Sequence, residues 1–161
     1  MCEELRHESR VRKVSIQLQS SMSDSSVKTY SGSLAERSDG FCLSWNQPAD
    51  EAEGSEQRYR LSYIPSQEQL CLERTGDSKL DLCFHTGCRT EGYLTIPQGQ
   101  ILIEIQTLRM TIPDFREDVD SFGNNTEHEL LLQYQLLFQS ADPTENLLSL
   151  KISLETEEKA I

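Results

Sequence analysis

The feature that most constrains this chain is strict alternation of apolar and polar residues. Between residues 148 and 154, Leu, Leu, Ile and Leu alternate with Ser, Lys and Ser, and Val14, Ile16 and Leu18 alternate in the same way with polar neighbours. Successive side chains of a β-strand point to opposite faces, so each such run predicts a half-buried strand. No stretch of the chain has a sustained helical period. The sequence therefore predicts an all-β protein.

Short segments of turn-forming residues separate the alternating runs. Ser38-Asp39-Gly40, Gly76-Asp77-Ser78 and Pro97-Gln98-Gly99-Gln100 each contain Gly next to Asp, Ser, Pro or Gln, which is typical hairpin chemistry. About eight to ten strands at this spacing favour an up-and-down antiparallel meander. A sheet of that size loses its exposed edges when it closes, so we expect an antiparallel β-barrel.

One long run changes its apolar face partway along. Its early Ile residues occupy odd positions and its later apolar residues occupy even positions. The run comprises Ile101, Ile103 and Ile105, followed by Leu108, Met110 and Ile112. An extra residue near Gln106-Thr107 would restore the phase, so we expect a β-bulge or bend there.

The length of 161 residues fits one domain. We assign the barrel to residues 11–156, with a flexible segment at 1–10 and a frayed tail at 157–161. Two acidic segments, Gln47 to Glu56 and Pro113 to Glu127, interrupt the alternation and predict loops.

A net charge of −12 disfavours nucleic acid and anionic membrane surfaces as partners. The same charge is compatible with a basic protein partner that docks on the acidic loops, or simply with solubility. The segment from Met1 to Lys13 is charged and lacks an apolar core, so we expect no signal peptide and a cytoplasmic location. No run of 18 apolar residues predicts a membrane span.

Five cysteines at irregular spacing, in a chain without an export signal, favour reduced thiols over disulfides. Cys83, His85 and Cys88 lie within six residues, and Cys71 faces Cys83 if the flanking leucines are paired. That group invites a zinc site, but it lacks the paired spacings of zinc motifs. We predict no metal site here. The register that pairs Cys71 with Cys83 also places the like charges of Glu73 and Asp81 opposite each other, which argues mildly against that register.

No catalytic signature is present. The chain contains no nucleophile elbow, phosphate-binding glycine loop or His-Glu-x-x-His motif. His7, His85 and His128 are scattered, and we expect them to be exposed. We therefore assign no catalytic residue and no cofactor, and favour a non-enzymatic protein.

The ordered set of motifs between Val14 and Leu154 resembles the bacterial YwiB-like family, domain of unknown function 1934. The motifs are Leu72-Glu73-Arg74-Thr75-Gly76, Leu80-Asp81-Leu82-Cys83-Phe84 with Gly87, Tyr93 to Gly99, Ile105-Gln106-Thr107-Leu108, the run at 130–136, and Asn146 to Ile152. The resemblance implies a small lipocalin-like (calycin-type) barrel and no established activity. The chain departs from the family by its acidic segments and its cysteines.

Arg74 continues the apolar parity of Leu70 and Leu72, which would direct its guanidinium toward the barrel interior. A carboxylate ligand would pair with it, and a purely structural role bonded to the protein's own groups is the alternative. Residues with a polar tip on or near apolar faces would line a cavity with it. These are Tyr59, Tyr63, Tyr93, Thr95, Thr107 and Tyr134.

Two hypotheses about function follow from the sequence. The first is a barrel that binds a small amphipathic or carboxylate-bearing ligand in its lumen. The second is a structural or adaptor protein whose barrel is filled by its own side chains and whose acidic loops dock a basic protein partner.

Overall fold

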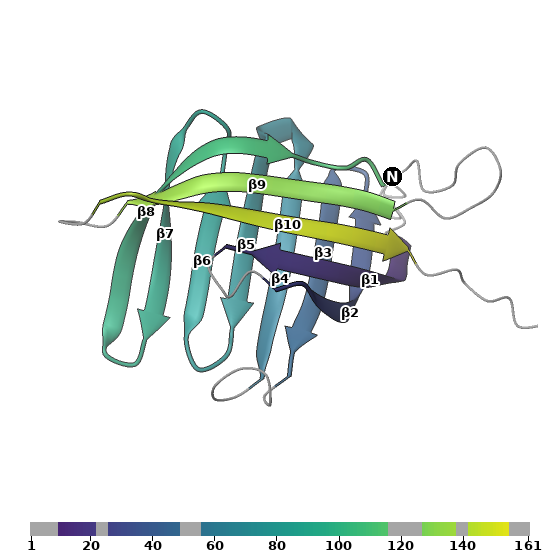
Figure 1. The fold of residues 1–161 in the computed structure, drawn as a ribbon, viewed down its shortest axis with the longest axis horizontal. Helices are drawn as coiled ribbons and strands as arrows, with labels where there is room; N and C mark the ends of the chain where they lie inside the picture. Colours follow the sequence, from purple (N-terminus) through teal and green to yellow (C-terminus); the bar gives the residue numbers. More distant parts are fainter. Residues whose placement is uncertain (1–9, 22–25, 49–55, 116–126, 138–141, 155–161) are drawn as a thin grey trace, which may run out of the picture.

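The computed structural model describes residues 10–21, 26–48, 56–115, 127–137 and 142–154. Within these ranges ten strands form one closed antiparallel barrel (Figure 1). The predicted all-β, up-and-down barrel is confirmed. Most of both predicted terminal segments and much of the two acidic segments lie outside the described residues. None of the described residues belongs to a helix long and apolar enough to cross a bilayer.

The strands follow one another around the barrel in chain order, and β1 closes it by pairing with both β2 and β10. A single 3-10 turn, η2, joins β4 to β5. The strands are β1 (Arg10–Ser20), β2 (Lys28–Arg37), β3 (Gly40–Gln47), β4 (Gln57–Ile64), β5 (Gln69–Thr75), β6 (Lys79–Phe84), β7 (Arg89–Ile96), β8 (Gly99–Thr111), β9 (Glu127–Leu137) and β10 (Thr144–Leu154), and η2 is Pro65–Gln67.

The barrel is flattened into two layers whose strands cross at a steep angle. In Figure 1, β9, β10 and β1 run across the front of the molecule, and β3 to β7 run behind them in nearly the perpendicular direction. Side chains from the inner faces of the two layers meet between them and form one hydrophobic core. Strands that pass from one layer to the other must bend.

β8 makes one of these bends, and a bulge produces it. Thr107 pairs with Tyr134 and Arg109 pairs with Gln133, so Leu108 is the extra residue between them. The predicted change of phase is thereby confirmed. Leu108 itself was expected on the inner face, and this was wrong, because the bulge residue turns outward and is 41% exposed.

β2 makes a second bend beside Gly32, which is paired with Val14 on one side and Trp45 on the other. A Cβ atom on Gly32 would lie 2.4 Å from the carbonyl oxygen of Ser44 and 2.8 Å from Cδ1 of Ile16. Only glycine permits this close approach of backbones at a barrel corner.

A disulfide joins Cys71 to Cys83 on the outer face of the barrel. The two residues are directly paired across β5 and β6, with a Cα–Cα distance of 4.0 Å, and the predicted pairing of Leu72 with Leu82 holds. The expectation of reduced thiols was wrong for this pair. That expectation was based on a predicted cytoplasmic location, whereas the pairing of β5 with β6 places the two sulfurs within bonding distance. Cys42 and Cys88 are free.

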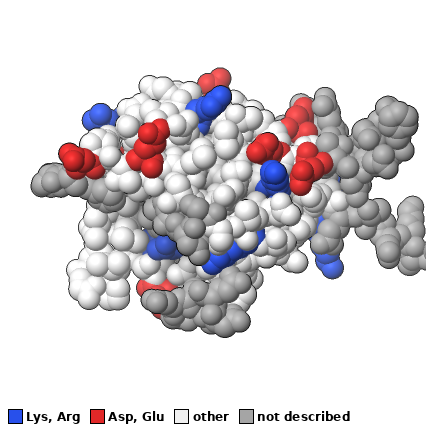
Figure 2. Space-filling model, in the orientation of Figure 1, with Lys and Arg blue, Asp and Glu red and all other residues white. Residues whose placement is uncertain are grey.

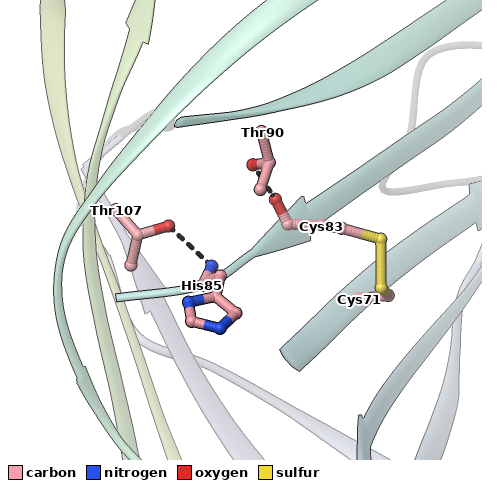
Figure 3. The surroundings of a disulfide bond; sticks show 5 residues. All are labelled: Cys71, Cys83, His85, Thr90 and Thr107. Carbon is pink, nitrogen blue, oxygen red and sulfur yellow. Dashed lines mark hydrogen bonds between the residues drawn. A yellow bond between two sulfur atoms is a disulfide. The ribbon is translucent and has the colours of Figure 1, made fainter. Parts of the chain in front are cut away.

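The disulfide lies where β6 loses its other partner. β6 and β7 pair only through residues 79–81 and 93–95. Beyond that point, hydrogen bonds to side chains take the place of backbone pairing. The hydroxyl of Thr90 donates to the carbonyl of Cys83, and the amide of His85 donates to Oγ1 of Thr107 (Figure 3). The disulfide therefore fastens β6 to β5 beside a weak seam.

We predict that replacing both Cys71 and Cys83 by Ser lowers the free energy of unfolding by up to about 3 kcal/mol. The bond spans a sequence separation of 12, and removing it restores the conformational freedom of that short loop in the unfolded chain. Urea denaturation without reductant measures the loss, and dithiothreitol should reproduce it in the unaltered protein. Cys88→Ser, at an exposed free thiol, serves as control. Equal unfolding midpoints with and without reductant would contradict the prediction.

Candidate functional site

The middle of the barrel is filled by its own side chains. The inner-face side chains with 0% exposed surface are Val14, Ile16, Leu34, Leu43, Leu61, Leu70, Phe84, Ile105, Leu130, Leu132, Leu150 and Ile152. A void able to hold a water molecule would expose the side chains around it. Any space for a ligand must therefore lie toward an end of the barrel.

Aromatic residues occupy one end. Phe115, which follows β8, packs edge-on against Phe41 with ring centroids 4.9 Å apart, and Tyr63 lies 5.8 Å from Phe41 on the other side. His128 also packs against Phe115, at 4.9 Å. His128 is only 7% exposed, so the expectation that it is exposed was wrong. Its place on the inner parity of β9 explains the burial.

The other end carries a row of paired inner-face residues with a different composition. The register runs from Trp45 through Tyr59, Arg74, Leu80 and Leu94 to Ile101, one residue from each of β3 to β8. Trp45 is buried, but the other members of this row are partly or largely exposed. An aromatic pair, a cation and three aliphatic side chains thus form one strip, which is accessible except at Trp45.

Trp45 and Tyr59 form the aromatic part of this strip. Their rings stack with centroids 5.2 Å apart and an interplanar angle of 1°. The phenol oxygen of Tyr59 lies 3.1 Å from Oε1 of Gln47 and 3.2 Å from Oε1 of Gln57, so its one proton is within donating distance of both amide oxygens. Burial raises the pKa of Tyr59, while the nearby Arg74 guanidinium acts to lower it. The phenol therefore stays neutral and is held in place.

Arg74 supplies the charge of the strip. Its Nη2 donates to Oγ of Ser78 at 2.9 Å, which orients the guanidinium. Its Nε is buried and has no hydrogen-bond partner among the described residues. Leaving a buried donor without a partner is costly, and more so for a charged group. A carboxylate that approached the Nε edge would satisfy this donor and pair with the charge.

Thr107 and Tyr134 are neighbours, but they lie away from Arg74. They are paired across β8 and β9, beside the bulge, and both are buried. The hydroxyl of Thr107 accepts from the His85 amide at 3.2 Å, and the ring of Tyr134 packs 5.0 Å from Phe84. Burial raises the pKa of Tyr134 to about 12. These two residues form part of the packed interior.

Tyr93 and Thr95 lie on the outer face of β7. Gly92 is buried and Leu94 packs against the core, so the residues that alternate with them point away from the lumen. Tyr93 is 37% exposed, and Thr95 accepts a hydrogen bond from Nε2 of Gln100 at 3.3 Å. Of the other six predicted site residues, only Tyr59 therefore lies beside Arg74, while Thr107 and Tyr134 meet each other elsewhere in the barrel.

The cysteine-histidine group does not form a metal site of the kind considered from the sequence. Cys71 and Cys83 are bonded to each other and are not available as thiolate ligands (Figure 3). Cys88 follows the turn at residues 86–87. No group of three His, Cys, Asp or Glu residues suited to a metal ion occurs among the described residues.

The family model for a domain of unknown function, DUF1934, matches residues 11–150. The chain belongs to this family. The expected membership is confirmed, and the match covers β2 to β9 completely, all but the first residue of β1 and most of β10.

A crystal structure of the YwiB protein from Bacillus subtilis is similar to this DUF1934 barrel. The similarity covers 91% of this chain and 94% of that one, with a TM-score of 0.67 and 11% sequence identity. At this identity the likeness supports the shared fold alone. No protein with a curated description matches the chain significantly.

Sequence reasoning missed Trp45, Gln47 and Gln57 as members of the Arg74 end. The parity of Trp45 with Phe41 and Leu43 already placed its ring on the inner face. The missing information was the register of β3 against β4, which the intervening long loop does not specify. That register decides that Trp45 meets Tyr59.

We predict that Tyr134 makes the protein less stable as pH rises from about 10 to 12. The folded-state pKa of about 12 lies above the ordinary value of 10.0. As pH rises, Tyr134 therefore loses its proton first in the unfolded chain, and this ionisation stabilises the unfolded state relative to the folded one. The loss should be roughly 2–3 kcal/mol across that range. Urea denaturation at stepped pH measures it, and Tyr134→Phe should flatten the curve. A Tyr134→Phe protein with an unchanged slope would contradict the assignment.

Proposed function

We propose that this protein binds a small amphipathic carboxylate at the Arg74 end of its barrel. The observation that carries the proposal is the buried, unpartnered Nε of Arg74 on a strip that is otherwise aromatic and aliphatic. A guanidinium offers a carboxylate two parallel hydrogen bonds, and Ser78 already fixes its orientation. The guanidinium of Arg74 is therefore suited to bind one anionic head group.

The rest of the strip suits an apolar ligand body. Leu80 and Leu94 are partly exposed and follow Arg74 in the register, and Ile101 at its far end is exposed. On the other side of Arg74, the ring of Tyr59, which stacks on the buried Trp45, supplies a flat wall. Covering such surface with a hydrocarbon chain is favourable in proportion to the apolar area removed from water. We infer a ligand that lies along the end of the barrel, since the midsection is packed.

This placement narrows the first hypothesis drawn from the sequence, from the whole lumen to one end. A lipocalin-like barrel would normally enclose its ligand more deeply, as expected for barrels with an open interior. Here the side chains with no exposed surface fill that depth. The same packing is the observation in favour of the second hypothesis, an adaptor with a filled barrel.

The fluorescence of Trp45 tests the proposal directly, because it is the single Trp of the chain and stacks on the residue beside Arg74. We expect decanoate to change this fluorescence at a concentration at least about tenfold lower than 1-decanol, since only the carboxylate pairs with the guanidinium. Arg74→Met should remove this preference. Arg74→Lys should keep part of it, because the charge remains but the two parallel hydrogen bonds do not.

Stability measurements separate binding from a structural role. Arg74→Met removes the buried Nε donor that has no partner and also the hydrogen bond from Nη2 to Ser78, and these opposing effects should leave the free energy of unfolding within about 0.5 kcal/mol of its original value. Arg109→Met, at an exposed position on β8, is the matched control and should keep the preference for decanoate. Equal responses to decanoate and 1-decanol in the unaltered protein would contradict the proposal. Strong destabilisation by Arg74→Met, with the preference intact, would identify a structural arginine.

A further inference from the structure

A groove of about 430 Å³ lies on the outer face of β3, β4 and β5. Trp45 and Arg74 lie on the opposite face of these strands, because residues that alternate with them line the groove, and Tyr59 of the Arg74 strip also contributes to its lining. The outward side chains along it are Ser44, Asn46, Arg58, Arg60, Glu73 and Thr75. The volume falls in the range of small-molecule sites, roughly 300–1,000 Å³.

The register arranges these side chains in two rows. Arg58 lies between Asn46 on β3 and Thr75 on β5, and Arg60 lies in the next row between Ser44 and Glu73. The two arginines are two positions apart on one face of β4, a separation of roughly 7 Å along the strand. All these residues except Glu73 can donate a hydrogen bond. The groove is thus rich in donors.

Glu73 is the one acidic side chain of the groove, and its charge is already compensated. Its Oε1 accepts from Nη2 of Arg60 at 2.9 Å, and its Oε2 lies 3.4 Å from Nζ of Lys79. The hydrogen bond from Arg60 and the nearby Lys79 lower the pKa of Glu73, against the opposing effect of burial. These two cations also offset the like charge of Asp81, which faces Glu73 across the ladder.

Arg58 makes no ion pair with any described residue. Arg58, Arg60 and Lys79 carry three positive charges, and Glu73 and the facing Asp81 carry two negative ones, so this part of the surface keeps one net positive charge. The whole chain has a net charge of −12. Figure 2 shows that acidic and basic side chains are dispersed rather than gathered on the face in view. The net negative charge of the chain repels anions from most of its surface, so a positive groove is the place where an anion is expected to bind.

We propose that this groove binds the oxyanion group of a small molecule, a phosphate or a carboxylate, through the guanidinium of Arg58. Asn46 and Thr75 flank that guanidinium and donate to the remaining oxygens of the anion, and Arg60 lies close enough to meet a second anionic group. The site does not depend on the Arg74 proposal. The two are on opposite faces of the same strands, and each has its own arginine.

The test uses the full chain and two probes, inorganic phosphate and succinate, at constant ionic strength set with sodium chloride. Backbone amide signals of residues 44–46, 58–60 and 73–75 in NMR spectra report binding. We expect Arg58→Gln to weaken binding by about tenfold or more, because it removes a charge-assisted pair of hydrogen bonds. Arg109→Gln removes the same charge from an exposed position outside the groove and should change affinity by less than about twofold.

A gain-of-binding variant guards against misfolding as an explanation. Glu73→Gln removes the one negative charge of the groove and releases Arg60 and Lys79, so it should tighten binding severalfold. Binding of phosphate but not succinate identifies a phosphorylated ligand, and the reverse identifies a carboxylate. Absence of shifts with both probes would overturn the proposal. Equal weakening by Arg58→Gln and Arg109→Gln would overturn it too, because that pattern indicates unspecific attraction.

Discussion

Closure of the sheet between β1 and β10 is the constraint on which the rest of the structure depends. Seven residue pairs, from Val14 with Leu154 to Ser20 with Leu148, join strands from opposite ends of the chain. An open ten-stranded sheet would leave two edges with unpaired backbone groups, and closure removes both. Closure also requires that the sheet turn through two steep corners. The bulge at Leu108 and the close backbone approach at Gly32 meet that requirement.

Flattening of the closed barrel decides where function can reside. The two layers approach closely enough for Leu43, Leu61 and Leu132 to lose all exposed surface, so the middle of the lumen holds protein rather than ligand. Aromatic packing of Phe115 against Phe41 occupies one end. Charged and partly exposed inner side chains are left at the other. The chemistry of the interior is therefore confined to the neighbourhood of Arg74, where the free donor lies.

The sequence predicted the features that depend on local alternation. The hairpin at Asp39-Gly40, the phase change before Leu108 and the inward parity of Arg74 follow from which residues share a face. Features set by register across long loops, or by three-dimensional proximity, were not accessible. The stack of Trp45 on Tyr59 depends on the register of β3 against β4 across a long loop. The burial of His128 against Phe115 depends on the proximity of segments that are distant in the sequence. The Cys71–Cys83 bond was missed for another reason. The sequence already paired the two residues across a hairpin, but the expectation of a cytoplasmic location led to a prediction of reduced thiols.

Alternation also explains how three neighbouring strands carry arginines on two faces, one for each of the two proposed sites. On β4 and β5, Tyr59 and Arg74 point inward, while Arg58, Arg60 and Glu73 point outward, one residue along the chain. Inside, desolvation makes an unpartnered guanidinium nitrogen costly, so a single carboxylate gains both charge pairing and the missing hydrogen bond. Outside, water screens the charges, and affinity must come from several donors acting together. If both proposals hold, we therefore expect the inner site to prefer one head group on an apolar body and the outer groove to prefer a compact anion with many oxygens.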